Sequence, residues 1–141
     1  VEQLPIARWG EDGFLNHEGE VFRPSDGQAW QSLPLLAGPE GTAESLMASY
    51  RRIGEMLAPL HLKVEQLLVD ERGEVEAVLA GGTRVVLGSE EFLERMRRFV
   101  RVYRAELAPV ASRVQRVDLR YADGVAVAFA ELPAEPAVTV E

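Results

Sequence analysis

The stretch Arg113–Phe129, RVQRVDLRYADGVAVAF, decides the fold of this chain because it predicts a β-hairpin. In its first half, Val117, Leu119 and Tyr121 alternate with polar residues, which is the two-residue period of a half-buried strand. The next three residues, Ala122-Asp123-Gly124, are typical of a tight hairpin loop in which the glycine takes the left-handed conformation. The sheet is therefore expected to end with two antiparallel strands.

The length of that loop predicts the register of the two strands. A three-residue loop brings the large apolar side chains of the hairpin onto one face, whereas a two-residue Asp-Gly turn would mix charged and apolar residues on each face. We therefore favour the three-residue loop. The predicted pairs are Tyr121 with Val125, Leu119 with Val127 and Val117 with Phe129, and the opposite face carries Asp118, Arg120, Ala126 and Ala128.

The second strand of the hairpin is expected to lie at an edge of the sheet. Phe129 is followed by Ala-Glu-Leu-Pro-Ala-Glu-Pro, and the two prolines exclude another regular strand. An edge strand presents unpaired N–H and C=O groups. Such an edge is either covered or able to accept a strand from a partner.

The composition indicates one globular domain without nucleic-acid-binding or thiol chemistry. Of the 141 residues, 47% are hydrophobic and 27% are charged, and this length is sufficient to bury a core. The net charge of −8 argues against a surface for nucleic acids or anionic membranes. The absence of cysteine excludes disulfides and thiolate–metal sites.

The start of the chain suggests a piece of a longer protein. No stretch approaches the roughly 20 apolar residues of a membrane helix, and no signal peptide is visible. Because the chain begins at Val1 without methionine, we expect it to be an excised fragment from which an anchor or targeting segment is missing.

Two helices are predicted ahead of the hairpin. The first spans residues 42–58, with Thr42 as its N-cap and Pro59 as its stop. The second spans residues 90–108, with Ser89 as its cap. Each carries an apolar stripe at helical spacing: Leu46, Tyr50, Ile53 and Leu57 in the first, and Phe92, Met96, Phe99, Tyr103 and Leu107 in the second.

Short strands are predicted on either side of the first helix. Alternation and turn residues place them within residues 1–9, 14–16 and 20–23, followed by an extended segment from residue 33, and then at residues 62–69, 75–79 and 83–87. Because short turns join most of these strands, we predict an α+β fold, with a mixed or antiparallel β-sheet flanked by two α-helices. The tail at residues 132–141 is expected to be disordered.

Sequence patterns for catalysis, cofactors or metals are missing. His17 and His61 stand alone, without a second ligand at metal-binding spacing, and the serines lack the G-x-S-x-G context of a nucleophile. We therefore expect no catalytic, cofactor-binding or metal site.

The second predicted helix is rich in arginine, which could form an anion site. Glu91 and Glu94 precede two of these arginines by four residues, so intrahelical ion pairs on a solvated face are the favoured interpretation. The arginines are Arg95, Arg97, Arg98, Arg101 and Arg104, and the predicted pairs are Glu91–Arg95 and Glu94–Arg98.

Several motifs together resemble the periplasmic β-domain of the FtsQ/DivIB family of bacterial cell-division proteins. In chain order they are ARWG, LNHEGEVF, LPLLAGPEG, VLAGGTRVVLG, RMRRFVRVY and VDLRYADGVAVAF. They span nearly the whole chain up to about residue 131. The resemblance implies the β-domain fold of this family over residues 10–131, with a C-terminal edge hairpin, and makes residues 1–9 the last strand of a preceding POTRA domain.

The resemblance also implies a function and a location. Members of this family are non-enzymatic scaffolds of the divisome that bind FtsB together with FtsL and regulate septal peptidoglycan synthesis. They carry a short cytoplasmic tail and one membrane helix, so that the β-domain lies at the periplasmic face of the inner membrane at the division septum. The chain is thus expected to bind neither nucleic acid nor any cofactor, and to meet the membrane only through a segment outside this sequence.

In this family FtsB adds a strand to the last strand of the β-domain. By motif position the resemblance makes the backbone of Val125–Phe129 the docking edge, gives Tyr121 and Phe129 as aromatic contacts, and lets Arg72 and Arg120 pair with partner carboxylates. Family members can have Trp where this chain has Phe129, and Ser where this chain has Asp123. Relative to such members, this chain keeps the aromatic surface and adds a negative charge. The implied partner-binding residues are Arg72, Arg120, Tyr121, Asp123, Gly124, Val125, Val127 and Phe129.

Three alternatives stay open. Tyr121 and Phe129 could be core residues, because the predicted register places them on the apolar face. The domain could bind a small ligand or hydrolyse one in an unrecognised pocket around Glu94, Arg97 and Arg98. The edge strand could instead serve self-association.

Overall fold

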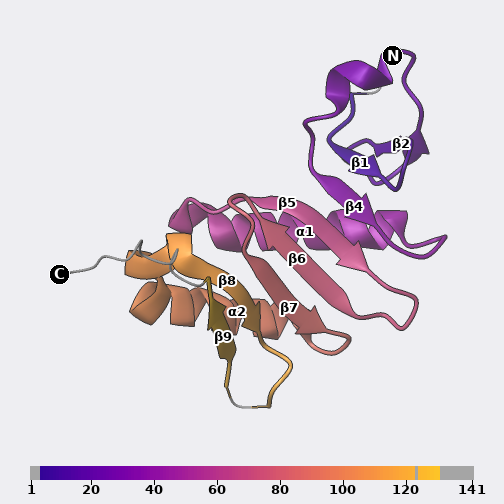
Figure 1. Cartoon of the computed structure of the whole chain (residues 1–141). Coiled ribbons are helices and arrows are strands. Elements are labelled where there is room, and N and C mark those ends of the chain that lie inside the picture. Colours follow the sequence, from indigo (N-terminus) through magenta and orange to yellow (C-terminus); the bar gives the residue numbers. More distant parts are fainter. Residues whose placement is uncertain (1–3, 123, 131–141) are drawn as a thin grey trace.

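The computed structural model describes residues 4–122 and 124–130, which form one mixed β-sheet with helices packed on it (Figure 1). The strands of this part lie in the order β3-β2-β1-β4-β5-β6-β7-β8-β9. The predicted α+β class is confirmed. The strands are β1 (Ala7–Trp9), β2 (Gly13–Leu15), β3 (Val21–Phe22), β4 (Leu35–Ala37), β5 (Val64–Val69), β6 (Val75–Leu79), β7 (Arg84–Gly88), β8 (Val114–Asp118) and β9 (Ala126–Phe129).

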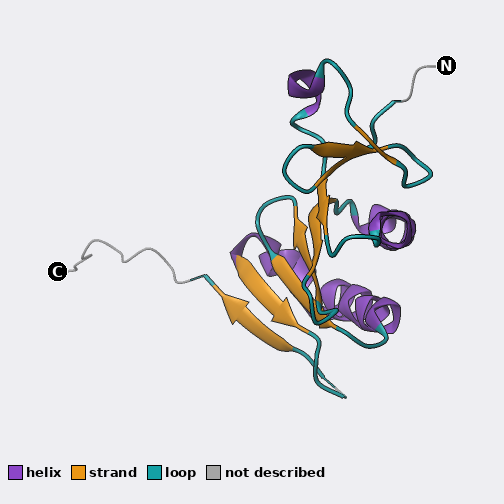
Figure 2. Ribbon diagram, turned by 90° about the vertical axis from the view of Figure 1, so that its right-hand side faces the viewer, coloured by secondary structure: helices purple, strands orange, loops and turns teal. Residues whose placement is uncertain are grey.

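Both α-helices cover the same face of the sheet (Figure 2). Helix α1 (Ala43–Leu57) connects the parallel strands β4 and β5, and α2 (Phe92–Val102) connects the parallel strands β7 and β8. The two crossovers run in the same direction along the sheet. Because such crossovers are right-handed, they must place both helices on one face. The opposite face stays open to solvent.

Helix α1 forms as predicted, with its apolar stripe in the core. Leu46, Ile53 and Leu57 are buried and Tyr50 is half-buried. The helix begins one residue after Thr42, whose hydroxyl donates to the carbonyl of Pro39 instead of capping the helix. It ends at Leu57 and passes into a short 3₁₀ helix, η2 (Ala58–Leu60), because Pro59 cannot donate the hydrogen bond that would continue an α-helix.

Helix α2 is shorter than predicted, and Ser89 is not its cap. The residue before the helix is Glu91, in the left-handed conformation with φ of 49°. Beyond Val102 the chain continues as a π-helical turn, η3 (Tyr103–Leu107), and a 3₁₀ segment, η4 (Ala108–Arg113). The predicted stripe is otherwise confirmed: Met96, Phe99 and Leu107 are buried, and Phe92 and Tyr103 pack against them half-buried.

The predicted register of the C-terminal hairpin is wrong. Strands β8 and β9 pair Val117 with Val127 and Asp118 with Ala126, and an irregularity then brings Val114 opposite Phe129. Pairing between the two strands stops at Asp118, so the connection runs from residue 119 to residue 125 and is longer than a three-residue loop. The cause is local: a carboxylate oxygen of Asp118 accepts a hydrogen bond from the backbone N–H of Arg120 and turns the chain away from β9.

The prediction that the last strand forms an edge is confirmed for the described part of the chain. Strand β9 pairs with β8 on one side and ends the sheet on the other. The other end of the sheet is β3 in the N-terminal part, beside the β1–β2 hairpin (Figure 1). The prediction of a disordered tail at 132–141 lies outside the described residues.

Candidate functional site

The edge strand β9 lacks the protection that edge strands usually carry. Its residues Ala126–Phe129 include no charge and no proline, and three of the four are exposed. At the opposite edge, β3 has only two residues and is followed by Arg23 and Pro24. Short length, charge and proline are the usual means of blocking strand addition. Of the two edges in the described part of the sheet, β9 is therefore the one suited to pair with another strand.

The two aromatic side chains of the hairpin lie on the surface. Tyr121 is 55% exposed and Phe129 is 44% exposed, so the alternative that both are core residues is wrong. The guanidinium of Arg113 lies over the Phe129 ring, 5.7 Å from its centroid, which holds the ring at the edge by a cation–π contact. Core packing in the hairpin comes instead from Val117 and Leu119, both fully buried.

Asp118 is the buried anchor of this region. Only 4% of its side chain is exposed, yet it stays charged because Arg120 surrounds it with donors. The Arg120 Nε and Nη2 atoms lie 3.0 and 2.8 Å from the two carboxylate oxygens, and Arg116 Nη1 lies 3.5 Å away. These hydrogen bonds, above all those from the Arg120 side chain, lower the pKa of Asp118 against the opposing effect of burial.

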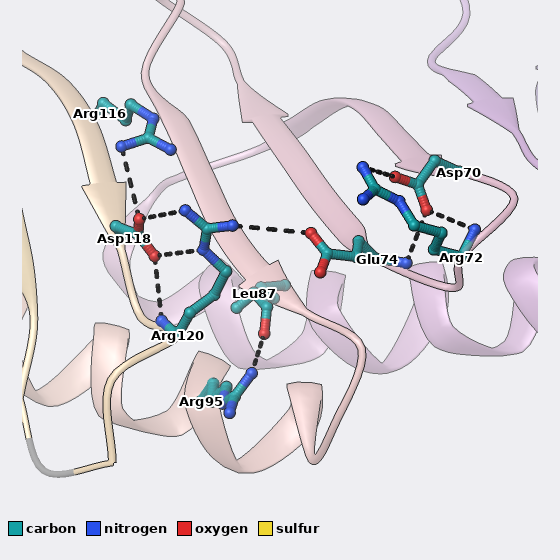
Figure 3. Close-up of polar contacts among 8 residues, drawn as sticks. All are labelled: Asp70, Arg72, Glu74, Leu87, Arg95, Arg116, Asp118 and Arg120. Atoms are coloured by element: carbon teal, nitrogen blue, oxygen red, sulfur yellow. Dashed lines mark hydrogen bonds and ion pairs between the residues drawn. The ribbon is translucent and has the colours of Figure 1, made fainter.

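Arg120 connects this anchor to the turn between β5 and β6 (Figure 3). Its Nη1 atom lies 3.7 Å from Oε1 of Glu74. The same turn carries Arg72, which is exposed. Asp70 shapes the turn by accepting hydrogen bonds from the backbone N–H groups of Glu74 and Arg72. These hydrogen bonds lower the pKa of Asp70, and the bond from Glu74 has the largest effect. The fold thus brings the two predicted partner-binding arginines to one end of the sheet.

Two arginines of α2 do not form the predicted intrahelical pairs. Arg95 donates to the carbonyl of Leu87 over 2.7 Å, and Arg98 donates to three carbonyls of the connection between β8 and β9. Arg97, one position before Arg98, pairs with Glu94 as an exposed surface residue does. The arginine-rich helix is therefore not a uniformly solvated face, because the guanidinium groups of Arg95 and Arg98 bond to backbone carbonyls of other elements.

Gly88 makes the close approach of these side chains possible. It ends β7 with φ of +77°, where other residues are strained, and a Cβ atom there would lie 2.5 Å from Nη1 of Arg95 and 3.0 Å from Cγ of Arg120. The backbone of β7 can therefore lie directly beneath both arginines.

The predicted site residues are placed as follows. Arg120, Tyr121, Gly124 and Val125 lie in the connection before β9, and Val127 lies within β9. Val125 and Val127 are half-buried. Asp123 lies outside the described residues. Sequence reasoning missed Asp118, Glu74 and Arg98. The sequence held no signal for Arg98, because the 3.6-residue period places Arg97 and Arg98 at equal angles from the buried stripe of Met96 and Phe99.

Elsewhere the described residues offer no catalytic arrangement. A groove of about 940 Å³ lies beside the start of β5, lined among others by Arg8, Tyr50, His61 and Lys63. Burial raises the pKa of Tyr50, which favours the protonated phenol. Among residues 4–122 and 124–130, no group of three or more acidic or histidine side chains could hold a metal ion.

Comparison with known proteins agrees with this geometry. Residues 7–120 match the family model described as cell division protein FtsQ/DivIB, C-terminal. Proteins named cell division protein FtsQ are similar to the chain: that of Coxiella burnetii is 35% identical over 89% of this chain, and that of Escherichia coli K12 is 34% identical over 96%. These alignments cover 52% and 50% of the relatives, so the chain spans about half the length of the curated relatives it matches. In the described part, no helix has both the length and the apolar character to cross a membrane.

Proposed function

We propose, because this chain belongs to the FtsQ/DivIB family of cell-division proteins, that it is a non-enzymatic protein-binding domain whose partner adds a strand to β9. The family resemblance supplies the identity of that partner, FtsB together with FtsL. It also supplies the setting: a full-length protein with one membrane helix that presents this domain in the periplasm at the division septum. There it links early and late division proteins and regulates septal peptidoglycan synthesis.

The observation that carries this proposal is the uncharged, proline-free edge at Ala126–Phe129. Strand addition uses the backbone groups of such an edge for affinity and side-chain pockets for specificity. Tyr121 and Phe129 flank the edge with exposed aromatic surface, and aromatic residues are enriched among the side chains that dominate binding energy. On the other side of the same region, Arg72 and Arg120 offer positive charge on a chain whose net charge is −8.

Arg120 has a specific role in this proposal. Its Nε and Nη2 atoms face Asp118, while Nη1 makes only a long contact with the partly exposed Glu74. A partner carboxylate can approach this guanidinium without displacing the buried Asp118. Binding would then be electrostatically steered toward the edge, and its rate would fall as salt increases.

The proposal is tested by titrating the chain with a peptide from the membrane-distal part of the cognate FtsB, using calorimetry. Tyr121→Ala is expected to weaken binding by more than about tenfold, equivalent to about 1.4 kcal/mol. Leu4→Ala is the matched control, because Leu4 is 64% exposed but lies far from β9 in the sequence and outside the hairpin. Hydrogen exchange of the amides at Ala126–Phe129 should slow when the peptide binds.

Two results would contradict the proposal. The first is a folded chain that does not bind the peptide at all. The second is binding that leaves exchange at β9 unchanged and is equally strong for Tyr121→Ala, which would place the contact on another surface.

A further inference from the structure

The exposed part of the connection between β8 and β9 accepts three hydrogen bonds from a single side chain of another element. Arg98 of α2 donates from Nη1 to the carbonyls of Tyr121 and Gly124, over 2.8 and 3.1 Å, and from Nη2 to the carbonyl of Ala122, over 3.1 Å. One guanidinium group thus contacts the segment on both sides of its tip. All the hydrogen bonds that Arg98 makes in the described part of the chain go to this connection.

Arg98 is well suited to hold these carbonyls in place. It is half-buried, and its neighbours on α2, Met96 and Phe99, are fully buried in the core, so the helix provides a rigid base. A guanidinium presents its N–H groups in a fixed planar fork, and hydrogen bonds from a charged donor are stronger than neutral ones. Leu119 at the start of the connection is fully buried, but the residues that Arg98 contacts contribute little packing of their own, since Tyr121 and Ala122 are exposed.

We propose that Arg98 is a positioning residue for partner binding: it orders the backbone of Tyr121, Ala122 and Gly124 in advance, so that Tyr121 and the start of β9 are already placed for an incoming strand. This inference rests on the proposed function. Fixing the backbone of a mobile segment costs conformational entropy, and a segment ordered beforehand does not impose that cost on binding. Arg98 contributes to affinity in this way without contacting the partner.

Arg98→Gln and the more conservative Arg98→Lys test this role, with Arg101→Gln as the matched control. Arg101 lies on the same helix but is exposed to solvent. In the free chain, Arg98→Gln is expected to speed hydrogen exchange at Tyr121, Ala122 and Gly124 while leaving the exchange of α1 and β5–β7 unchanged. Its Kd for the FtsB peptide should rise about tenfold, mostly through slower association, because only a fraction of molecules holds the competent loop.

The variants separate positioning from a general loss of structure. Arg98→Lys keeps a charged donor and should fall between the wild type and Arg98→Gln in both exchange and affinity, while Arg101→Gln should match the wild type. If Arg98→Gln does not fold, Arg98→Lys carries the same test.

The inference and the proposed function fail differently. Binding by the wild type with a Kd that stays within twofold in the Arg98 variants would overturn the inference alone. So would unaltered exchange at Tyr121, Ala122 and Gly124. No binding by the wild-type chain would overturn the proposed function, and this inference with it.

Discussion

Replacing Asp118 by asparagine tests the electrostatic anchor of the C-terminal hairpin. The carboxylate accepts two hydrogen bonds from the Arg120 side chain and one from its backbone, and only 4% of the Asp118 side chain is exposed. Breaking a fully buried ion pair costs about 3–5 kcal/mol. Because 43% of the Arg120 side chain is exposed and can be rehydrated, we expect a smaller loss of about 2 kcal/mol in the free energy of unfolding at pH 7.

The loss is measured by urea unfolding, followed by circular dichroism, at several pH values. The pKa of Asp118 is lowered in the folded state, so its contribution is complete above the unfolded-state value of about 3.9 and disappears as pH falls through the lower folded-state value. The difference between wild type and Asp118→Asn should therefore shrink below about pH 4. Glu76→Gln is the control, because its pair with Arg84 is on the surface and contributes less than about 1 kcal/mol.

Either of two outcomes would refute this reasoning about Asp118. One is a loss at pH 7 no larger than that of Glu76→Gln. The other is a difference between the two proteins that stays constant from pH 7 down to acid unfolding, since a charge-dependent anchor must weaken as its carboxylate is protonated.

Other substitutions test the packing around the hairpin by thermal or urea unfolding. Gly88→Ala should lower the free energy of unfolding by about 1–3 kcal/mol, because alanine is strained at a φ of +77° and its Cβ would meet Arg95; a variant as stable as wild type would contradict the assigned geometry. Phe99→Ala removes a ring that is 1% exposed and should cost about 3–5 kcal/mol. The free energy of unfolding of Tyr121→Ala should stay within about 0.5 kcal/mol of that of wild type, because Tyr121 is a surface residue. A loss as large as that of Phe99→Ala would show that Tyr121 is a core residue.

Features that depend on local pattern were predictable from the sequence. The apolar stripes of both helices point into the core as their 3.6-residue spacing requires, and β6 has the predicted bounds Val75–Leu79. The edge position of the last strand followed from the two prolines that come after it. In each case neighbouring residues alone decide the structure, because periodicity and missing backbone donors act within a few positions.

Features that depend on side chains meeting across elements were not predictable. The alternation from Val117 to Tyr121 is that of a continuous strand, yet Asp118 bonds to the backbone two residues later and ends the pairing. Arg98 looked like a member of an ion pair with Glu94, because the distance from α2 to the hairpin connection cannot be seen in sequence. Local hydrogen bonding and tertiary contacts overrode the pattern at these positions.

The unequal edges of the sheet limit how large an assembly it can build. Within the described residues the two-residue strand β3 is a poor template for another strand, so extension of the sheet is favoured at β9. A strand donated by a partner covers that edge, so a second copy of the chain cannot pair with it at the same time. Two copies meeting through β9 would form a closed two-fold dimer that uses the same edge, so self-pairing and partner binding exclude each other in a single molecule.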